Sequence, residues 1–215
     1  MLGRALENVT HKDLNALYQQ QILLPLHMQT IGIIVPTSLQ ANYARGHDIE
    51  GQAVNATPLS LLPADDAMKA SSADMQRFLS TAIGLPGTPE RILYPMRLTQ
   101  SVFVELPNAL MQGLGWQVHP LDKNYVQGLL DANANGLGPI NVLEMYKKPI
   151  YSGDMLIDKT GTTNGFRSYI AVIPNKKSGI VILANKNVPG NAIVRAGRQI
   201  LFILNHIDAG TADKV

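Results

Sequence analysis

The sequence predicts an α+β fold of the α/β sandwich type, in which an antiparallel β-sheet is flanked by helices. Three short runs rich in β-branched and aromatic residues indicate strands, at residues 155–157, 166–173 and 180–184. Residues 174–179 begin with proline and end with glycine, which is typical of a turn between the last two runs. From Pro189 onward, apolar residues recur at helical spacing and predict a terminal helix whose apolar side covers the sheet.

A first helix is predicted near the N-terminus, over residues 10–24. Thr10 is the expected N-cap, and Asp13 places a negative charge in the first turn. Residues 30–62 are interrupted by prolines and glycines, so we expect a long irregular segment there. Because such a long connection in a compact domain is usually functional, we expect it to form one wall of a cleft.

The middle of the chain predicts further helices. Ser71 or Ser72 caps a helix that runs to about Ile83, since apolar residues repeat there at helical spacing. An irregular stretch is expected over residues 84–95, followed by a helical segment over residues 96–104.

The domain organisation follows from these elements. The glycines and tryptophan of residues 113–116 indicate the start of a strand, and residues 122–149 are polar and rich in Asn and Gly. We interpret residues 1–215 as a portion of one domain. Residues 1–150 are expected to be mainly helical and loop, and residues 151–215 to hold the antiparallel strands and the C-terminal helix.

Composition excludes several function classes. The 215 residues carry a net charge of +2, from 18 basic and 16 acidic residues scattered along the chain, so no nucleic-acid partner is expected. The absence of cysteine excludes disulfides and thiolate metal sites. The longest apolar run, residues 180–184, is too short to span a membrane, and Met1–Arg4 lacks a signal-peptide pattern.

Metal and carboxylate chemistry have weak support in the sequence. The histidines are dispersed without metal-ligand spacing, and we expect most of them on the surface or in loops: His11, His27, His47, His119 and His206. Asp65 and Asp66 are adjacent, and adjacent side chains usually point apart, so a solvated loop is the preferred interpretation. We expect neither a metal nor a cofactor.

The tripeptide Lys159-Thr160-Gly161 is the motif with a chemical role. On a strand, Lys159 and Gly161 point to one face and Thr160 to the other. Lys159 then offers a cation that binds an anionic substrate group and favours deprotonation of a neighbouring hydroxyl. Gly161 leaves room for a substrate to lie against the strand. The alternative is an ordinary lysine on a solvated edge strand.

The residues around this tripeptide resemble class C serine β-lactamases of the penicillin-binding-protein-like superfamily. Residues 159–174 and 179–187 are similar to the region that carries the third active-site motif of that family. Residues 24–28, 42–44 and 112–116 are similar to further family segments, in the family's order. The resemblance implies the C-terminal portion of a β-lactamase/transpeptidase-like fold, incomplete at its N-terminal side, without a cofactor, in a periplasmic protein.

The resemblance also implies roles for individual residues. Lys159 and the backbone N–H of Thr162 are the expected catalytic groups, the latter as half of an oxyanion hole. The expected substrate-binding residues are Thr160, Gly161, Asn187, Asn191 and Arg167.

This sequence departs from the family pattern at several positions. Ile193 stands where the family has an arginine that helps to bind the substrate carboxylate, and Asn191 or Arg195 replaces it only after a local shift. Arg167 replaces a glycine and places a second cation at the cleft mouth or extends into solvent. Residues 64–67 lack the family's aromatic side chain. Carboxylate recognition and one substrate wall are therefore expected to differ.

Two family motifs do not occur in this chain. No serine is followed three positions later by lysine, and no tyrosine is followed two positions later by asparagine. The first pattern supplies the family's nucleophile and the second its general-base region, both upstream of the segment that Leu2 begins. Since a serine hydroxyl needs an adjacent base to attack, we expect the lone chain to be inactive.

Three functions are compatible with the sequence: β-lactam hydrolysis through an acyl-enzyme, a related penicillin-binding D,D-peptidase or esterase activity, and a non-catalytic remnant. The first two require an upstream half. The expected ligand is a β-lactam or a peptidoglycan-like small molecule. An N-terminal complementing chain or self-association is expected to cover the apolar edge or face that an incomplete sheet exposes.

Overall fold

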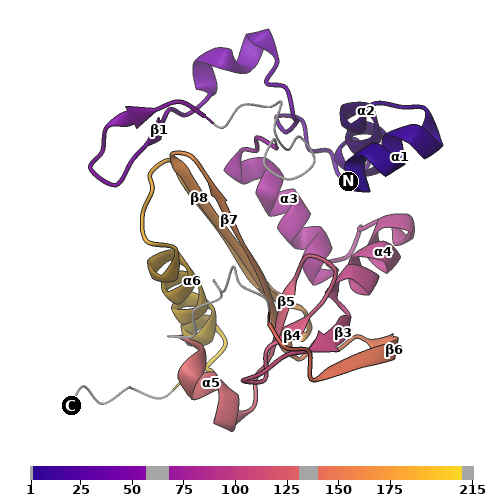
Figure 1. Ribbon diagram of the computed structural model, residues 1–215, viewed down its shortest axis with the longest axis vertical. Helices are drawn as coiled ribbons and strands as arrows, with labels where there is room; N and C mark the ends of the chain where they lie inside the picture. The colour runs from indigo at the N-terminus through magenta and orange to yellow at the C-terminus, as the bar shows by residue number, and fades with distance from the viewer. Residues whose placement is uncertain (1, 57–67, 131–139, 210–215) are drawn as a thin grey trace. The chain divides into compact units, whose positions relative to one another are not determined.

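The computed structural model describes residues 2–56, 68–130 and 140–209 of the chain (Figure 1). The chain divides into two compact units, which we treat separately. Unit 1 comprises Met1–Phe78, Thr162–Arg167 and Leu183–Val188, and unit 2 comprises Leu79–Gly161, Ser168–Ile182 and Pro189–Val215.

Unit 1 begins with two short helices instead of the single predicted one. α1 spans Leu2–Thr10 and α2 spans Leu14–Tyr18, and a π-helical turn follows over Gln19–Leu23. Thr10 ends α1, so its prediction as an N-cap is wrong. The true cap is Asp13, whose side chain accepts the Ala16 N–H over 2.9 Å. The two helices are separated where His11 takes a positive φ of 53°.

The segment predicted as irregular, residues 30–62, contains only short regular elements where it is described. A 3-10 helix covers Thr37–Asn42, and β1 (Gly46–His47) pairs antiparallel with β2 (Ala53–Val54). Residues 57–62 lie outside the described part of the chain. A place for this segment beside a cleft stays a prediction.

The predicted helix after Ser71 is confirmed as α3, which spans Ser72–Ile83. Ser71 accepts the Asp74 N–H over 3.2 Å and acts as the cap. Asp74 is buried, and its carboxylate accepts the backbone N–H of Gln29 over 2.9 Å and of Thr30 over 3.0 Å. The start of α3 thereby holds the loop that follows the N-terminal helices.

A seven-stranded sheet with the order β6-β3-β4-β5-β7-β8-β9 forms most of unit 2. The pairs of β3 with β4 and β6, of β4 with β5, and of β5 with β7 are all antiparallel, as predicted. The strands span Val102–Glu105 (β3), Met111–Gln112 (β4), Gln117–Pro120 (β5), Glu144–Ile150 (β6), Met155–Thr163 (β7), Phe166–Ile173 (β8) and Ser178–Ala184 (β9). The ends of β7, β8 and β9 next to the β7–β8 turn belong to unit 1.

The region between α3 and the sheet differs from its prediction. α4 spans Glu90–Gln100, so neither the irregular stretch 84–95 nor the helix 96–104 was correctly bounded. Pro89 precedes the helix as its N-cap residue, and Pro95 lies inside it. Residues 102–105 form β3, and all of β3 to β6 lie before residue 151. The first 150 residues therefore contribute strands as well as helices and loops.

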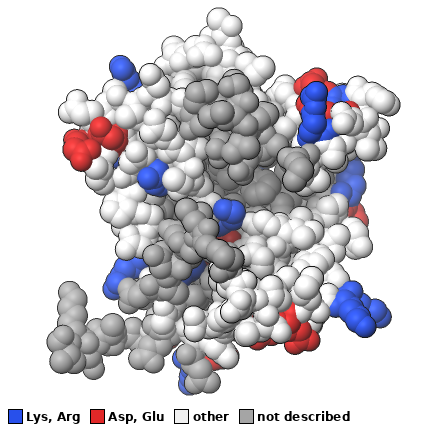
Figure 2. Space-filling view, viewed as in Figure 1, with Lys and Arg blue, Asp and Glu red and all other residues white. Residues whose placement is uncertain are grey.

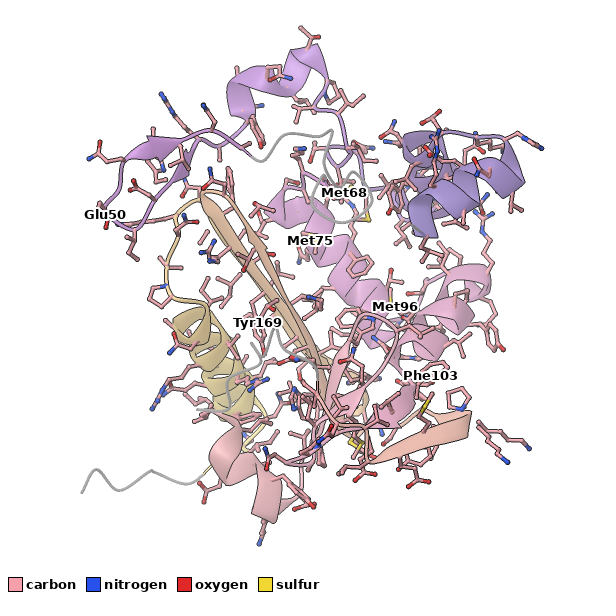
Figure 3. All side chains as sticks on the ribbon, viewed as in Figure 1. Glu50, Met68, Met75, Met96, Phe103 and Tyr169 are labelled. Carbon is pink, nitrogen blue, oxygen red and sulfur yellow. The ribbon has the colours of Figure 1, made fainter. Side chains whose placement is uncertain are left out.

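The predicted terminal helix is α6, which spans Gly190–Leu204 and runs beside the sheet (Figure 1). Its buried face includes Leu201 and Phe202. A Cβ atom at Gly197 would lie 2.5 Å from a ring carbon of Tyr169 on β8, so glycine permits the close approach. Figure 3 shows Tyr169 on the sheet beside α6. The shorter helix α5 covers Lys123–Leu129.

On the face drawn in Figure 2, basic and acidic side chains are interspersed with uncharged surface. Among the described residues, no helix has the length and apolar character needed to cross a membrane.

Candidate active site

Lys159, Thr160 and Gly161 lie on β7, which passes through the interior of the sheet. The preceding residue, Asp158, is buried and bonds to Arg198 of α6. Because consecutive side chains of a strand alternate, Lys159 emerges on the face of the sheet opposite α6. Lys159 is exposed, and its Nζ atom donates to the carbonyl oxygen of Thr160 over 2.6 Å. Its cation is therefore accessible and lies close to the backbone of the motif.

Gly161 lies against the neighbouring strand β8. A Cβ atom at this position would overlap the Oγ atom of Ser168, whereas the Ser168 Cβ would be 3.7 Å away, an ordinary contact. Glycine thus leaves space that the serine hydroxyl already borders. A substrate group placed against Gly161 would meet that hydroxyl, a polar neighbour that the sequence interpretation did not include.

The turn between β7 and β8 is packed closely against β1. Gly165 has a positive φ of 80°, which favours glycine. A Cβ there would be 2.7 Å from the Cα of Gly46 and 2.6 Å from Val54. The His47 N–H donates to the carbonyl oxygens of Gly165 over 3.3 Å and Asn185 over 3.0 Å. The short β1 strand therefore joins the turn to the segment that follows β9.

Arg167 and Asn187, both expected to bind substrate, contact each other. Arg167 Nη1 donates to Asn187 Oδ1 over 2.8 Å, and the same oxygen accepts the Gly165 N–H over 3.0 Å. Arg167 also donates to the carbonyl oxygens of Thr163 over 3.1 Å and Phe166 over 2.8 Å. Its half-buried side chain folds over the turn, and this geometry replaces the expectation that it extends into solvent. The pair stabilises the turn that ends the motif strand.

Two further expected residues are on the surface. Thr162 is exposed on β7 directly after Gly161, and Asn191 is exposed near the start of α6. Ile193, at the position where an arginine was expected, is buried in the apolar face of α6. Residues 64–67, which include Asp65 and Asp66, lie outside the described part of the chain.

A buried polar cluster next to Lys159 was not predicted from the sequence. Tyr169 OH donates to Asp158 Oδ2 over 2.7 Å, and Arg198 donates to the same oxygen through Nε over 3.0 Å and Nη2 over 2.8 Å. The ring nitrogen Nε2 of His119 lies 3.2 Å from Asp158 Oδ1 and 3.1 Å from Arg198 Nη2. Arg198 Nη1 donates to the Leu129 carbonyl oxygen over 2.6 Å. His119 is therefore a core residue, the exception among five histidines of which most were expected on the surface or in loops.

The charges of this cluster compensate one another. Burial alone would raise the pKa of Asp158, but the His119 hydrogen bond and the Arg198 cation outweigh it and hold this pKa below its ordinary value. Burial and the Asp158 charge raise the pKa of the Tyr169 hydroxyl, so it stays protonated and donates. Among the described residues, no buried side-chain nitrogen or oxygen lacks a hydrogen-bond partner.

The sequence contains weak signals for this cluster. Asp158 directly follows the apolar strand residues 155–157, and Arg198 lies one helical turn from Val194 and Leu201 on the apolar face of α6. Charged residues at core positions indicate buried partners. No group of three or more His, Asp and Glu side chains in the described ranges is arranged to hold a metal ion.

Comparisons with known proteins give one consistent result. The sequence model of the β-lactamase family matches residues 1–204. A β-lactamase of Psychrobacter immobilis is 32% identical over 195 residues, which are 89% of this chain and 48% of that protein.

Solved structures resemble the chain as well. A protein described as a β-lactamase/D-alanine carboxypeptidase from Pseudomonas syringae superposes with a TM-score of 0.83 at 28% identity, covering 96% of this chain and 57% of that one. A class C β-lactamase from Rhodobacter sphaeroides superposes with a TM-score of 0.80 at 28% identity, covering 94% and 58%. The chain thus spans about half the length of the relatives it matches.

Proposed function

The chain belongs to the β-lactamase family, and from this premise we propose that it forms one wall of a class C serine β-lactamase active site that hydrolyses β-lactams through an acyl-enzyme. The observation that carries the proposal is the position of Lys159-Thr160-Gly161 on β7, with the Lys159 cation exposed opposite α6. The nucleophile belongs to a part of the domain that carries Ser-x-x-Lys, a pattern this chain lacks.

In the proposed reaction, the serine oxygen attacks the β-lactam carbonyl carbon, its proton passes by way of the general base to the ring nitrogen, and the ring C–N bond breaks. Lys159 binds an anionic group of the substrate and favours removal of the hydroxyl proton nearby. The Thr162 N–H donates to the oxyanion that develops on the carbonyl, where a preorganised donor is most effective. Water then attacks the acyl carbon, the ester bond breaks, and the serine oxygen takes up a proton from that water.

Substrate contacts are proposed to differ from those of the relatives. Asn187 Oδ1 already accepts two hydrogen bonds, from Gly165 and Arg167. We assign Arg167 and Asn187 first to holding the turn between β7 and β8. Because Ile193 is buried and uncharged, the polar group at the start of α6 that remains for substrate is the exposed Asn191. Thr160 and Gly161 complete the proposed contact surface along β7.

The lone chain is proposed to be inactive and to need a covering partner. Three large apolar side chains on the outer face of α6 are exposed: Ile200 by 44%, Ile203 by 67% and Leu204 by 65%. Surface helices normally present polar groups on such a face. The coverage of about half of each relative supports an N-terminal complementing chain as the partner, with self-association as the alternative.

The test combines this chain with the N-terminal segment of a full-length relative that carries Ser-x-x-Lys and Tyr-x-Asn. A labelled penicillin should form no adduct with the chain alone and should label the N-terminal segment only in the mixture. Hydrolysis of a chromogenic cephalosporin should follow the same pattern. The Lys159→Ala chain is the matched control and should lower both signals at least tenfold. Turnover by the wild-type chain alone would contradict the proposal of inactivity.

A D,D-peptidase is the second candidate, because the Pseudomonas syringae protein is described as both a β-lactamase and a D-alanine carboxypeptidase. The two activities differ in deacylation, since a penicillin-binding peptidase stays acylated by penicillin. A stable penicillin adduct in the mixture, with release of D-alanine from a peptide ending in D-Ala-D-Ala, would favour it. No adduct and no release would favour a non-catalytic remnant. For either enzyme we propose the periplasm as the compartment, where peptidoglycan-like substrates occur.

A further inference from the structure

Asp158 is buried directly beside the exposed Lys159, and three side chains from three other elements of unit 2 contact it. Its two oxygens lie within hydrogen-bonding distance of Tyr169 on β8, Arg198 on α6 and His119 on β5. Both Asp158 and Arg198 are almost fully buried, with exposed fractions of 1% and 0%. A pair of buried charges is weak evidence for stability, because desolvation offsets much of the attraction. Its position next to the motif suggests another role.

We propose that Asp158 is a positioning residue for Lys159. It acts by fixing the register of β7, and with it the face of the sheet to which each β7 side chain points. Residue 158 pairs with Gln117 and Leu156 pairs with His119 across the β5–β7 ladder. A slip of one residue would turn Lys159 toward α6 and Asp158 away from it. A slip of two residues would leave each side chain on the same face of the sheet. It would move the carboxylate by about 6.6 Å along the strand, since each residue rises by about 3.3 Å.

Either slip would leave a buried charge without its partner, and this makes the observed register the favoured one. Apolar residues such as Leu156 and Ile157 pack acceptably at several positions of a sheet, whereas Asp158 meets Arg198, Tyr169 and His119 at only one. Buried polar groups that set register are the best attested use of such interactions. The cluster therefore determines to which face of the sheet the Lys159 side chain points.

This inference deepens the proposed function and rests on it only in taking Lys159 as the catalytic cation. Two measurements on the full chain test it without any ligand. The first is the ¹³C resonance of dimethylated Lys159, assigned with the Lys159→Arg variant. The second is hydrogen exchange of the amides of residues 159–161, expressed relative to the amides of β3, Val102–Glu105, in the same sheet. The ratio separates a local loss of order on β7 from a general loss of stability.

Asp158→Asn should lower the relative protection of residues 159–161 at least tenfold and shift the Lys159 resonance. Arg198→Lys, which keeps the charge, should retain the wild-type resonance better than Arg198→Met. Tyr169→Phe removes one hydrogen bond and no charge, so it should fold and produce a smaller effect of about threefold. If Asp158→Asn does not fold, the protection ratio and the Lys159 resonance of Tyr169→Phe test the proposal.

Asp74→Asn is the matched control. Asp74 is also a buried carboxylate with several hydrogen bonds, but its partners are Gln29, Thr30, Ser71 and Arg77 in unit 1. This variant should lower the melting temperature without changing the Lys159 resonance or the protection ratio. The proposal is overturned if Asp158→Asn and Tyr169→Phe behave like Asp74→Asn. Failure of penicillin labelling together with a shifted Lys159 resonance would refute the proposed function and leave the positioning role intact.

Discussion

The Arg167 guanidinium and the Asn187 amide oxygen are 2.8 Å apart, and this contact joins the start of β8 to the segment after β9. The same oxygen accepts the Gly165 N–H, so one side chain holds both the turn and the cation that covers it. Two residues expected to contact substrate thus have a defined structural role in the turn that follows the motif.

Asn187→Ala should therefore destabilise the folded chain. It leaves a half-buried arginine and the N–H of the buried Gly165 without their shared acceptor, and such losses cost about 1–3 kcal/mol. Urea unfolding followed by circular dichroism measures the change. Gln40→Ala is the control, because Gln40 makes an exposed side-chain bond to the Val35 carbonyl oxygen and its loss should cost less than about 0.5 kcal/mol. Equal effects of the two variants would contradict this account.

Alanine should be tolerated better at Gly161 than at Gly165. At Gly161 the added Cβ meets only the Ser168 hydroxyl, which can rotate, so we expect a loss of about 1 kcal/mol. At Gly165 it meets the Gly46 backbone and Val54, and φ is 80°, so we expect about 3 kcal/mol or more. The unfolding midpoints of both variants test whether Gly161→Ala is the less destabilising of the two. Adding Ser168→Ala should relieve Gly161→Ala, and failure to do so would show that the clash lies elsewhere.

Acid should destabilise the chain through Asp158 and Asp74. For Asp74, burial opposes ionisation, but hydrogen bonds from Thr30 and Ser71 hold its pKa below 3.8. The pKa of Asp158 is lowered as well. A carboxyl whose folded pKa lies below its unfolded value stabilises the fold above that unfolded value. This stabilisation is lost as the pH falls through the lower folded pKa. Free energies of unfolding at pH 7, 5, 4 and 3 should fall mainly below pH 4, and Asp74→Asn should flatten the decrease. A decrease between pH 7 and 5 that Asp74→Asn leaves unchanged would point to other groups.

The outer face of α6 should drive association of the lone chain. Ile203→Glu places a charge where a large apolar side chain is 67% exposed, so it should lower the average mass in light scattering at equal concentration. Arg195→Glu changes an exposed position of the same helix without removing apolar surface and serves as the control. Association that is equal in wild type and Ile203→Glu would exclude this face as the contact surface.

The parts of the fold with regular local patterns were predicted well from sequence. β8 has the predicted bounds and α6 begins one residue after Pro189, because a β-branched run and a helical apolar face are local signals. α4 was misplaced because Pro95 was interpreted as the end of an irregular stretch, whereas the start signal was Pro89 followed by Glu90. Residues 102–104 were then assigned to the helix although they belong to β3.

The candidate site likewise has a part that was predictable from the sequence and a part that was not. The position of Lys159 on a strand follows from its neighbours in the chain, so it was predictable. The Asp158 cluster was not, because its members come from β5, β7, β8 and α6 and no local pattern relates them. The contact between Arg167 and Asn187 likewise depends on the pairing of β8 with β9, which brings together residues 20 positions apart.

The distances along the chain within the Asp158 cluster have a consequence for how the protein folds during synthesis. His119 and Arg198 are 79 positions apart, and Arg198 lies on the last helix. Since the chain leaves the ribosome N-terminus first, β5, β7 and β8 are complete while their cationic partner is still missing. We therefore expect Asp158 to stay hydrated until α6 docks, and β7 to take its final register only after that contact forms.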